Sequence, residues 1–371
     1  CNSRIQKNHQ RRTDFIPFCA LSVAKGMGIT MRKRNGLGVL AAVIVLSIGL
    51  AGCGGSNKGD QASKPAQASA TNVSASGSGS PELQKIRYAP FNGVSGLAVR
   101  FGAEKGFFKE EGLDVEFISA QNAIEAVTSN SVDIADNATT SAIVAAGKGA
   151  PIKIVSSMFR TKGPFYLVAA PGIESVEDLK GKKVGAAAFG SGLDAYTQVI
   201  LKQHGLSKDD VTYLANGAND AAYASLTSGQ VDATIIHEPF ASLAEQSGKG
   251  KILARGWDYL PNFHTGVFIS SNSFISDHPD LVEKLLRAYF KSQEYAKNNL
   301  DEYKAFFLEN IKIDAKAVDS AFEREQVLWE NNPDVNLKDL EETQQIQVEL
   351  GFQSEVYDVE KILDLRYIPK S

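Results

Sequence analysis

From about residue 83 onward, short apolar runs alternate with segments whose apolar residues recur every three or four positions. The first pattern is typical of strands and the second of amphipathic helices. Together they predict strands within 85–89, 113–118, 133–136 and 152–155, with helices between them, the first over 94–108. Strands that alternate with helices at this spacing indicate a parallel sheet built from β-α-β units.

The same alternation then repeats. Strands are predicted at 165–169, 183–187, 211–214, 232–236 and 251–253, and helices at 175–179, 190–205 and 220–228. The two halves also contain similar short sequences at equivalent positions. These are Asn130-Ser131-Val132-Asp133 and Gly229-Gln230-Val231-Asp232, each of which joins a predicted helix to a predicted strand. Two lobes, each with its own sheet, therefore fit the pattern better than one.

After a strand at 266–270 the pattern is helical to the end of the chain. Apolar positions predict helices near 277–295, 303–311, 314–330 and 337–351, with Asp277 as a cap candidate for the first of them. A body of roughly 290 residues is long for one hydrophobic core and natural for two. We expect the C-terminal helices to cover lobe one.

The first 82 residues follow a different pattern. The basic cluster Arg32-Lys33-Arg34 precedes an uncharged apolar run over 37–50, which is the order of a secretory signal. The run is shorter than the roughly 20 apolar residues of a membrane span. It ends in Leu50-Ala51-Gly52-Cys53, which resembles the lipobox of bacterial lipoproteins and implies palmitate-type lipidation of Cys53. A plain signal peptide, or a short anchor with an incidental cysteine, is the alternative.

These features divide the N-terminal part into three segments. We expect 1–30 to be a mis-called or disordered extension, 31–52 a signal peptide, and 53–82 a flexible tether from lipidated Cys53. The tether is rich in Gly, Ser, Ala, Gln and Asn and cannot bury enough apolar area to order itself.

Charge and cysteine usage exclude several function classes. The chain has a formal charge of −4, and 1–52 contain eight Lys or Arg and one acid, so the remainder carries about −11. An acidic surface argues against nucleic acid, which is bound through Lys and Arg. After cleavage Cys53 would be the last cysteine, which leaves no disulfide and no cysteine metal site. The five histidines form no ligand-spaced pair, and no serine-nucleophile or P-loop motif is present.

Four motifs resemble the nitrate/sulfonate/taurine group of type-II periplasmic binding proteins from ABC importers. The matching segments are Ile86-Arg87-Tyr88-Ala89-Pro90 with the helix and strand up to Val115, Leu179 to Gly185, Leu226 to Ala233 with Glu238-Pro239-Phe240, and Ile275 to Val282. The resemblance covers about 85–300. It implies an α/β fold of two doubly wound lobes joined by a two-strand hinge: lobe one over 83–160 and 265–371, and lobe two over 165–260.

Candidate binding residues follow from the carboxyl ends of the predicted strands, where open α/β sheets bind ligands. Several of these ends lead into helix N-termini, which favour anions. The candidates are Asn92, Ser95, Thr139, Thr140, Ser157, Arg160, Gly190, Ser191 and Gly192. The alternative for the Gly-Ser-Gly turn and the two threonines is simple turn formation and capping, and for Arg160 a surface position.

Two further candidates lie near lobe two. Glu238 matches the acid of a family segment that can face a ligand amine or ring, although an acid facing solvent or the hinge is as plausible. His237 stands where the family often has tryptophan, so stacking there is in question. Phe263 near the second crossover is also a candidate for lining the cleft.

The resemblance implies a non-enzymatic, extracytoplasmic lipoprotein, monomeric and without cofactor or metal. It would capture a small, anionic solute (a sulfonate, taurine or nitrate) and deliver it to a membrane permease driven by an ATPase. The anchor would hold it at the cell membrane, facing the periplasm or cell exterior. The alternatives are binding of a pyrimidine precursor or an aromatic acid, and then an enzyme on the same fold or a sensor ectodomain.

Overall fold

The computed structural model describes residues 82–91 and 96–370. The chain divides into the units Cys1–Ser74 and Ala75–Ser371, and all described residues lie in the second unit. The predicted signal peptide, Cys53 and most of the tether, and the candidates Asn92 and Ser95, lie outside the described residues. Within the described part, no helix combines the length and apolar character that crossing a bilayer requires.

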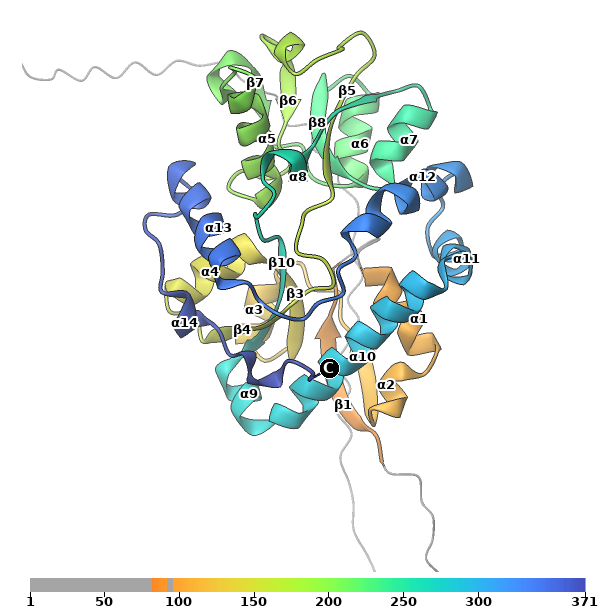
Figure 1. Ribbon diagram of the computed structural model, residues 1–371, viewed down its shortest axis with the longest axis vertical. Coiled ribbons are helices and arrows are strands. Elements are labelled where there is room, and N and C mark those ends of the chain that lie inside the picture. Colours follow the sequence, from red (N-terminus) through yellow and green to blue (C-terminus); the bar gives the residue numbers. More distant parts are fainter. Residues whose placement is uncertain (1–81, 92–95, 371) are drawn as a thin grey trace, which may run out of the picture. The chain divides into compact units, whose positions relative to one another are not determined.

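The first of two sheets has the strand order β2-β1-β3-β10-β4. Its strands are β1 (Gln84–Ala89), β2 (Leu113–Phe117), β3 (Ile134–Ala138), β4 (Ile152–Ser157) and β10 (Gly266–Ser271). Strands β2, β1 and β3 pair in parallel, whereas β10 runs antiparallel to both β3 and β4. The strand that returns late in the chain is thus inserted between two early ones (Figure 1).

The second sheet has the order β7-β6-β8-β5-β9. Its strands are β5 (Phe165–Ala169), β6 (Lys183–Gly185), β7 (Thr212–Leu214), β8 (Ala233–His237) and β9 (Lys251–Arg255). Here β5 is the antiparallel member, between β8 and β9. The chain therefore passes from one sheet to the other twice, between β4 and β5 and again between β9 and β10.

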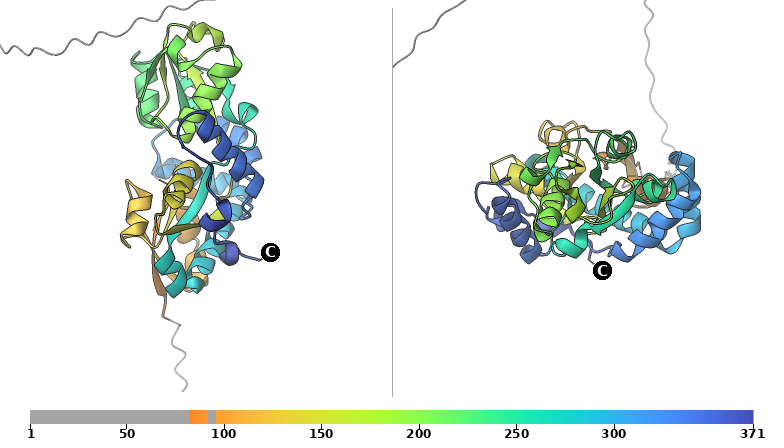
Figure 2. Two further views of the ribbon diagram at one scale, coloured as in Figure 1. Left: turned by 90° about the vertical axis from the view of Figure 1, so that its left-hand side faces the viewer. Right: turned by 90° about the horizontal axis from the view of Figure 1, so that it is seen from above.

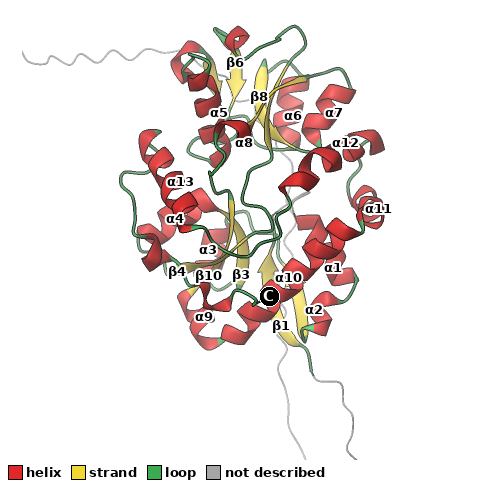
Figure 3. Cartoon of the chain, viewed as in Figure 1, coloured by secondary structure: helices red, strands yellow, loops and turns green. Residues whose placement is uncertain are grey.

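Alternate residues of each strand face different hydrophobic clusters, as the two-residue repeat of a strand requires. In the first sheet Ile134 and Phe268 belong to one core, and Ala135 and Ile269 to the other. Helices α1 (Leu97–Glu104), α2 (Phe107–Glu110) and α10 (Pro279–Asn298) supply the first core, and α3 (Ala123–Thr128), α4 (Thr139–Gly147) and α14 (Val359–Ile362) the second. Helices consequently cover both faces of this sheet (Figures 2 and 3).

The second sheet is also covered on both faces. Leu167 and Ile235 pack in a core with α5 (Gly192–Gln203), while Tyr166 and Ile236 pack with α6 (Asp220–Thr227) and α7 (Phe240–Gln246). The α/β class is the one that the sequence predicted, but each five-stranded sheet contains one antiparallel strand where a parallel sheet was expected.

The C-terminal helices contact both halves, which corrects the expectation that they cover lobe one alone. Helix α11 (Leu300–Asn310) stays on the first core, but α12 (Ala315–Glu325) packs against α7, where Arg324 binds Glu238 at 3.0 Å. Helix α13 (Leu337–Glu349) contributes Ile346 to the core of the second sheet. The physical reason is that α12 presents Arg324 to the Glu238 and Glu245 carboxylates, and α13 presents Ile346 to the apolar core of the second sheet.

Three predicted helices differ in detail. The helix expected at 94–108 is two helices, divided at Gly106, whose φ of 88° ends α1. The segment at 175–179 forms only a 3-10 turn, Glu177–Leu179, in which the Asp178 carboxylate accepts the backbone N–H groups of Glu174 and Ser175. The helix expected at 277–295 is preceded by a separate α9 (Asn272–Asp277), so Asp277 ends a helix instead of capping one.

Gly102 fixes the close approach of α1 to α10. A Cβ atom at this position would lie 1.8 Å from Ser292 Oγ and 2.2 Å from Ser292 Cβ. Gly102→Ala is therefore expected to lower the free energy of unfolding by about 1–3 kcal/mol, as overpacking does. Chemical denaturation measures this loss of stability. Combining the change with Ser292→Gly should recover part of the loss. If the effects of the two changes on the free energy of unfolding simply add, the predicted contact between Gly102 and Ser292 is contradicted.

Candidate functional site

A cavity of about 190 Å³ lies among residues of both sheets. Its lining comes from strand ends, because Ala138 ends β3, Met158 follows β4, His237 ends β8 and Asn219 follows β7. The full lining is Phe91, Ala138, Met158, Phe159, Arg160, Pro164, Phe165, Leu193, Asn219, His237, Thr265 and Gly266. We call this space the central cavity; it occupies the strand-end position at which open α/β sheets bind ligands.

Most of the central cavity is apolar and aromatic. Phe91, Met158, Phe159, Phe165 and Leu193 contribute side chains to its walls. The sequence analysis did not select these residues, although four of them lie within a few positions of a predicted strand end. Walls of this kind suit the apolar body of a small ligand, since most ligand pockets combine apolar walls with a few polar groups.

Arg160 is the one charged residue among those that line the central cavity. Its Nη1 donates to Glu325 Oε2 at 2.5 Å, and its guanidinium carbon lies 4.9 Å from the centroid of the Phe159 ring. The side chains of Arg160 and Glu325 are 11% and 14% exposed. A largely buried guanidinium in an otherwise uncharged cavity can hold an oxyanion through its planar set of donors. The structure thus places the predicted Arg160 at the cavity.

His237 provides an uncharged polar group in the same cavity. Burial, together with the nearby Arg160 cation, lowers the pKa of His237 to about 3. Its ring packs edge-on against Phe165 at 4.6 Å. A neutral imidazole offers one donor and one acceptor, so His237 can bond a ligand without adding charge.

Asn219 is a second polar residue that lines the cavity. It precedes α6, but its side chain makes no capping bond, and its backbone has φ 52° and ψ −118°. A non-glycine residue in this region of φ/ψ space is strained, and such strain clusters at functional positions.

Thr139 and Ser157 were predicted to offer hydroxyls to a ligand, and the structure places both hydroxyls in bonds within the protein. Both are fully buried, and both bond to His264: Thr139 Oγ1 lies 2.8 Å from Nδ1 and Ser157 Oγ lies 2.9 Å from Nε2. The backbone N–H of His264 donates to Thr343 Oγ1 at 2.8 Å. Their hydroxyls therefore fix the segment before β10 instead of lining the cavity. Thr140, 4% exposed, does not line the cavity either.

The turn Gly190-Ser191-Gly192 was predicted to bind an anion at the start of α5. The structure shows that Asp194 already supplies one: its Oδ2 accepts the Gly190 N–H at 2.7 Å, while Ser191 Oγ accepts the Asp194 N–H at 3.3 Å. A carboxylate at this place satisfies the helix dipole from within the chain. The three predicted residues are absent from the cavity lining, and only the next residue, Leu193, reaches it.

Glu238 and Phe263 are also placed elsewhere. Glu238 is 2% exposed, and its carboxylate accepts the Ser242 N–H at 2.8 Å, the Ser242 hydroxyl at 2.9 Å and Arg324 Nη1 at 3.0 Å. Burial raises its pKa. Phe263 is 1% exposed and packs edge-on against Tyr196. Neither side chain lines the central cavity, because Glu238 is hydrogen-bonded to Ser242 and Arg324 and Phe263 is packed against Tyr196.

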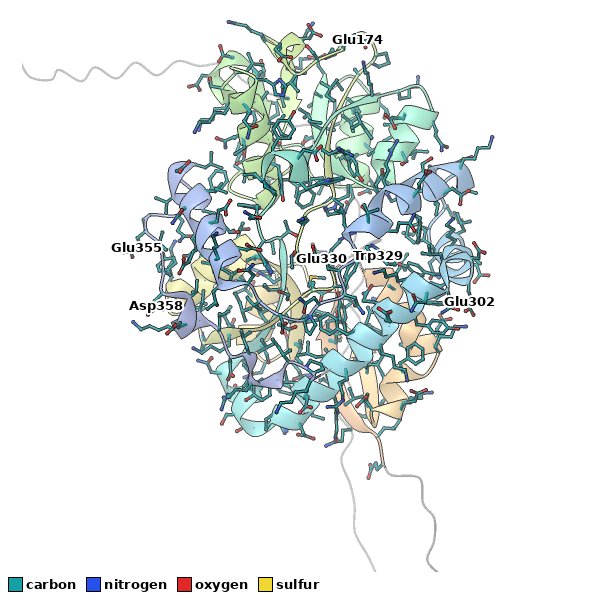
Figure 4. The ribbon with its side chains drawn as sticks, in the orientation of Figure 1. Glu174, Glu302, Trp329, Glu330, Glu355 and Asp358 are labelled. Atoms are coloured by element: carbon teal, nitrogen blue, oxygen red, sulfur yellow. The ribbon has the colours of Figure 1, made fainter. Side chains whose placement is uncertain are left out.

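A smaller space of about 40 Å³ shares Phe159 and Arg160 with the central cavity. Its wall is mostly apolar, and we call it the polar chamber for the few charged and amide side chains set into that wall. Its other lining residues are Ala98, Glu238, Pro239, Gln293, Tyr303, Phe307, Ala321, Phe322, Glu325 and Trp329. Gln293 Nε2 and Oε1 and Trp329 Nε1 are buried there without a hydrogen-bond partner in the described part of the chain. Trp329 lies just beyond α12 (Figure 4).

Metal ligation finds no support in the described ranges. Among residues 82–91 and 96–370, no three His, Cys, Asp or Glu side chains are grouped as a metal would require.

Comparison with known proteins places these features in a family. The profile of the family described as NMT1/THI5 like matches residues 97–303. A Bacillus subtilis protein, provisionally named an aliphatic sulfonates-binding protein, is 29% identical over 348 residues, or 91% of this chain and 97% of that protein. A 4-amino-5-hydroxymethyl-2-methylpyrimidine phosphate synthase of Saccharomyces cerevisiae is 29% identical over 211 residues, but only 60% of its length is covered.

Among solved structures, the periplasmic aliphatic sulphonate-binding protein of Escherichia coli is similar with a TM-score of 0.62 and 19% identity, over 77% of this chain and 92% of that one. At this level of identity the likeness establishes the fold alone. The chain has the periplasmic binding protein fold, as the sequence predicted.

Proposed function

Because the chain belongs to the NMT1/THI5-like family, we propose that it is a solute-binding protein and that its solute is a small organic anion held in the central cavity. The observation that carries the proposal is Arg160, a largely buried cation in a cavity whose other lining residues are uncharged. His237 and Asn219 supply neutral hydrogen-bonding groups beside it.

The chemistry of the walls narrows the class of anion. Phe91, Phe159 and Phe165 offer apolar contact, which nitrate cannot use. A sulfonate or carboxylate with an alkyl or aromatic body satisfies both the guanidinium and the rings. The name of the Bacillus relative, an aliphatic sulfonates-binding protein, supports the same class.

The transport role and the domain arrangement belong to the same proposal. The lobes would be 83–160 with 265–371, and 165–260; the five strands of each sheet fall within the corresponding ranges, which supports this division. Closure of the lobes about the two crossovers would trap the solute, and a permease with its ATPase would receive it. Lipidation of Cys53 would hold the protein at the outer side of the membrane.

One alternative has its own support. The yeast relative is named as a pyrimidine phosphate synthase, so binding or conversion of a pyrimidine precursor is the second candidate. A flat heteroaromatic ring would also fit the aromatic walls, but a neutral pyrimidine carries no negative charge for the Arg160 guanidinium to bind. Recovery of the added compound unchanged after prolonged incubation would separate binding from conversion.

A thermal-shift panel on the full chain in detergent tests the main proposal. The panel is methanesulfonate, benzenesulfonate, benzoate, nitrate and an aminopyrimidine, with benzenesulfonamide as the uncharged match for benzenesulfonate. A ligand at 100 times its Kd adds about 2.7 kcal/mol of stability, which corresponds to a rise of roughly 5–10 °C. No shift with any anion, or an equal shift with the sulfonamide, would refute anion binding.

A further inference from the structure

Arg160 forms part of the wall between the central cavity and the polar chamber, and its partner is Glu325. Arg160 follows β4, Glu325 ends α12, and the bond between them measures 2.5 Å. Glu325 accepts no other side-chain hydrogen bond from the described residues. A ligand anion that approaches Arg160 therefore meets a guanidinium that is already bound by a carboxylate. Holding two negative groups against one buried guanidinium costs free energy, because the two groups repel each other.

The charges around Glu325 leave Arg160 as its main source of stabilisation. Glu238 on the segment before α7 repels it, and Arg324, the neighbouring cation, is bound by Glu238 and Glu245. Burial, opposed by Arg160 and reinforced by Glu238, raises the pKa of Glu325 to about 7. The other titratable groups that face this pair are neutral at pH 7: Tyr166, Tyr289, Tyr303 and His237.

The polar chamber offers a second position for the Glu325 side chain. Both residues Gln293 and Glu325 line it. Neither amide atom of Gln293 has a hydrogen-bond partner of good geometry in the described residues, although the amide lies near the Tyr289 hydroxyl and opposes the rise of the Tyr289 pKa. A protonated carboxyl group also has one donor and one acceptor, so the two groups are complementary. Trp329 Nε1 adds another unused donor.

We propose that an oxyanion entering the central cavity replaces the Glu325 carboxylate on Arg160, and that Glu325 takes up one proton from solvent and turns to Gln293 in the polar chamber. This inference rests on the proposed function. The site keeps its charge balance throughout: the ligand becomes the counter-ion of Arg160, and the displaced acid becomes neutral. Glu325 is thus a residue that sets how tightly, and at what pH, the anion binds.

The proposal predicts a direction for the pH dependence. Above pH 7 the free protein holds Glu325 ionised on Arg160, so the affinity for the anion falls as the pH rises, by up to about tenfold per pH unit. Below about pH 6 the affinity levels off, because Glu325 is already protonated. The number of protons taken up on binding rises toward one as the pH rises through the pKa of Glu325.

The experiment is calorimetric titration of the full chain with benzenesulfonate, methanesulfonate and nitrate, strong-acid anions that do not titrate between pH 5 and 9. Repeating it in Bis-Tris and in Tris, cationic buffers whose ionisation heats differ, gives the number of protons taken up. Glu325→Gln should abolish the uptake, remove the pH dependence and bind at least about tenfold more tightly than the wild type at pH 8. Glu323→Gln, an exposed change on the same helix, should leave the proton uptake, the pH dependence and the affinity unchanged.

Asp136 is the other buried acid whose pKa burial raises to about 7, and it accepts hydrogen bonds from Tyr88 and Phe91 near the central cavity. Asp136→Asn should retain the proton uptake. Binding without net uptake in the wild type, or uptake that survives Glu325→Gln, would overturn the inference while leaving the proposed function intact. Failure of every panel anion to bind would refute the proposed function, and the inference would fall with it.

Discussion

Replacing Arg160 with glutamine is expected to weaken anion binding by about 30-fold to several thousandfold, the equivalent of about 2–5 kcal/mol. Arg160 is the charged group of the central cavity, and the amide that replaces it can neither balance a sulfonate nor offer two parallel donors. The loss should appear in the calorimetric Kd and in the disappearance of the ligand-induced thermal shift.

Two controls separate this effect from misfolding. Arg160→Lys keeps the charge but loses the planar fork, so its affinity should lie between those of the wild type and Arg160→Gln. Arg255→Gln removes an exposed arginine of β9 that pairs with Asp258 at 2.8 Å, and it should bind as the wild type does. If Arg160→Gln retains wild-type affinity with an unchanged melting temperature, the central cavity is not an anion site.

His264→Ala is expected to lower the free energy of unfolding by about 3–5 kcal/mol. The imidazole is 1% exposed and is the shared partner of Thr139 and Ser157, so its removal leaves a cavity and two buried hydroxyls without that partner. Urea denaturation measures the loss. His278→Ala, which changes an exposed histidine, is the matched control and should cost far less.

The same residue gives a pH dependence with a definite sign. Burial lowers the pKa of His264 to about 4, below the value of about 6.5 expected in the unfolded chain. Between pH 6.5 and 4 the unfolded chain takes up a proton and the folded protein does not, so stability falls as the pH falls, by up to about 1.4 kcal/mol per unit.

Other groups overlap this window, so the comparison with His264→Ala is what isolates it. His237, with a pKa of about 3, acts in the same direction. Asp136 and Glu325, with pKa values of about 7, act in the opposite direction because they are protonated in the fold and ionised when unfolded. In His264→Ala, the slope of the unfolding free energy against pH should lose only the contribution of His264. An unchanged slope would contradict a buried His264 that stays neutral.

The order of elements was accessible from the sequence because it depends on local periodicity. The strands at Gln84–Ala89 and Phe165–Ala169 and the helices Gly192–Gln203 and Asp220–Thr227 lie within a residue or two of their predicted bounds. The 3-10 turn at Glu177–Leu179 was misjudged because a Ser-x-x-Asp spacing is compatible both with a helix start and with an isolated turn.

The candidate site was less accessible, because a polar side chain's role depends on partners far away in the chain. Thr139 binds His264, 125 residues later, and this contact withdraws its hydroxyl from the cavity. Glu238 meets Arg324 on a helix that was expected to lie on the other lobe. Arg160 was selected for its charge beside a crossover, and the fold does bring it to the central cavity.

The sequence by itself determined that this chain forms two α/β halves, since spacing and periodicity are local properties. Only the tertiary structure decided which residues at those strand ends remain available to a ligand. At the start of α5, the Asp194 carboxylate accepts the Gly190 N–H within the turn that was predicted to bind an anion. At the cavity wall, Glu325 holds Arg160. The competition between a ligand and these built-in carboxylates depends on distances between residues far apart in sequence, which no local pattern records.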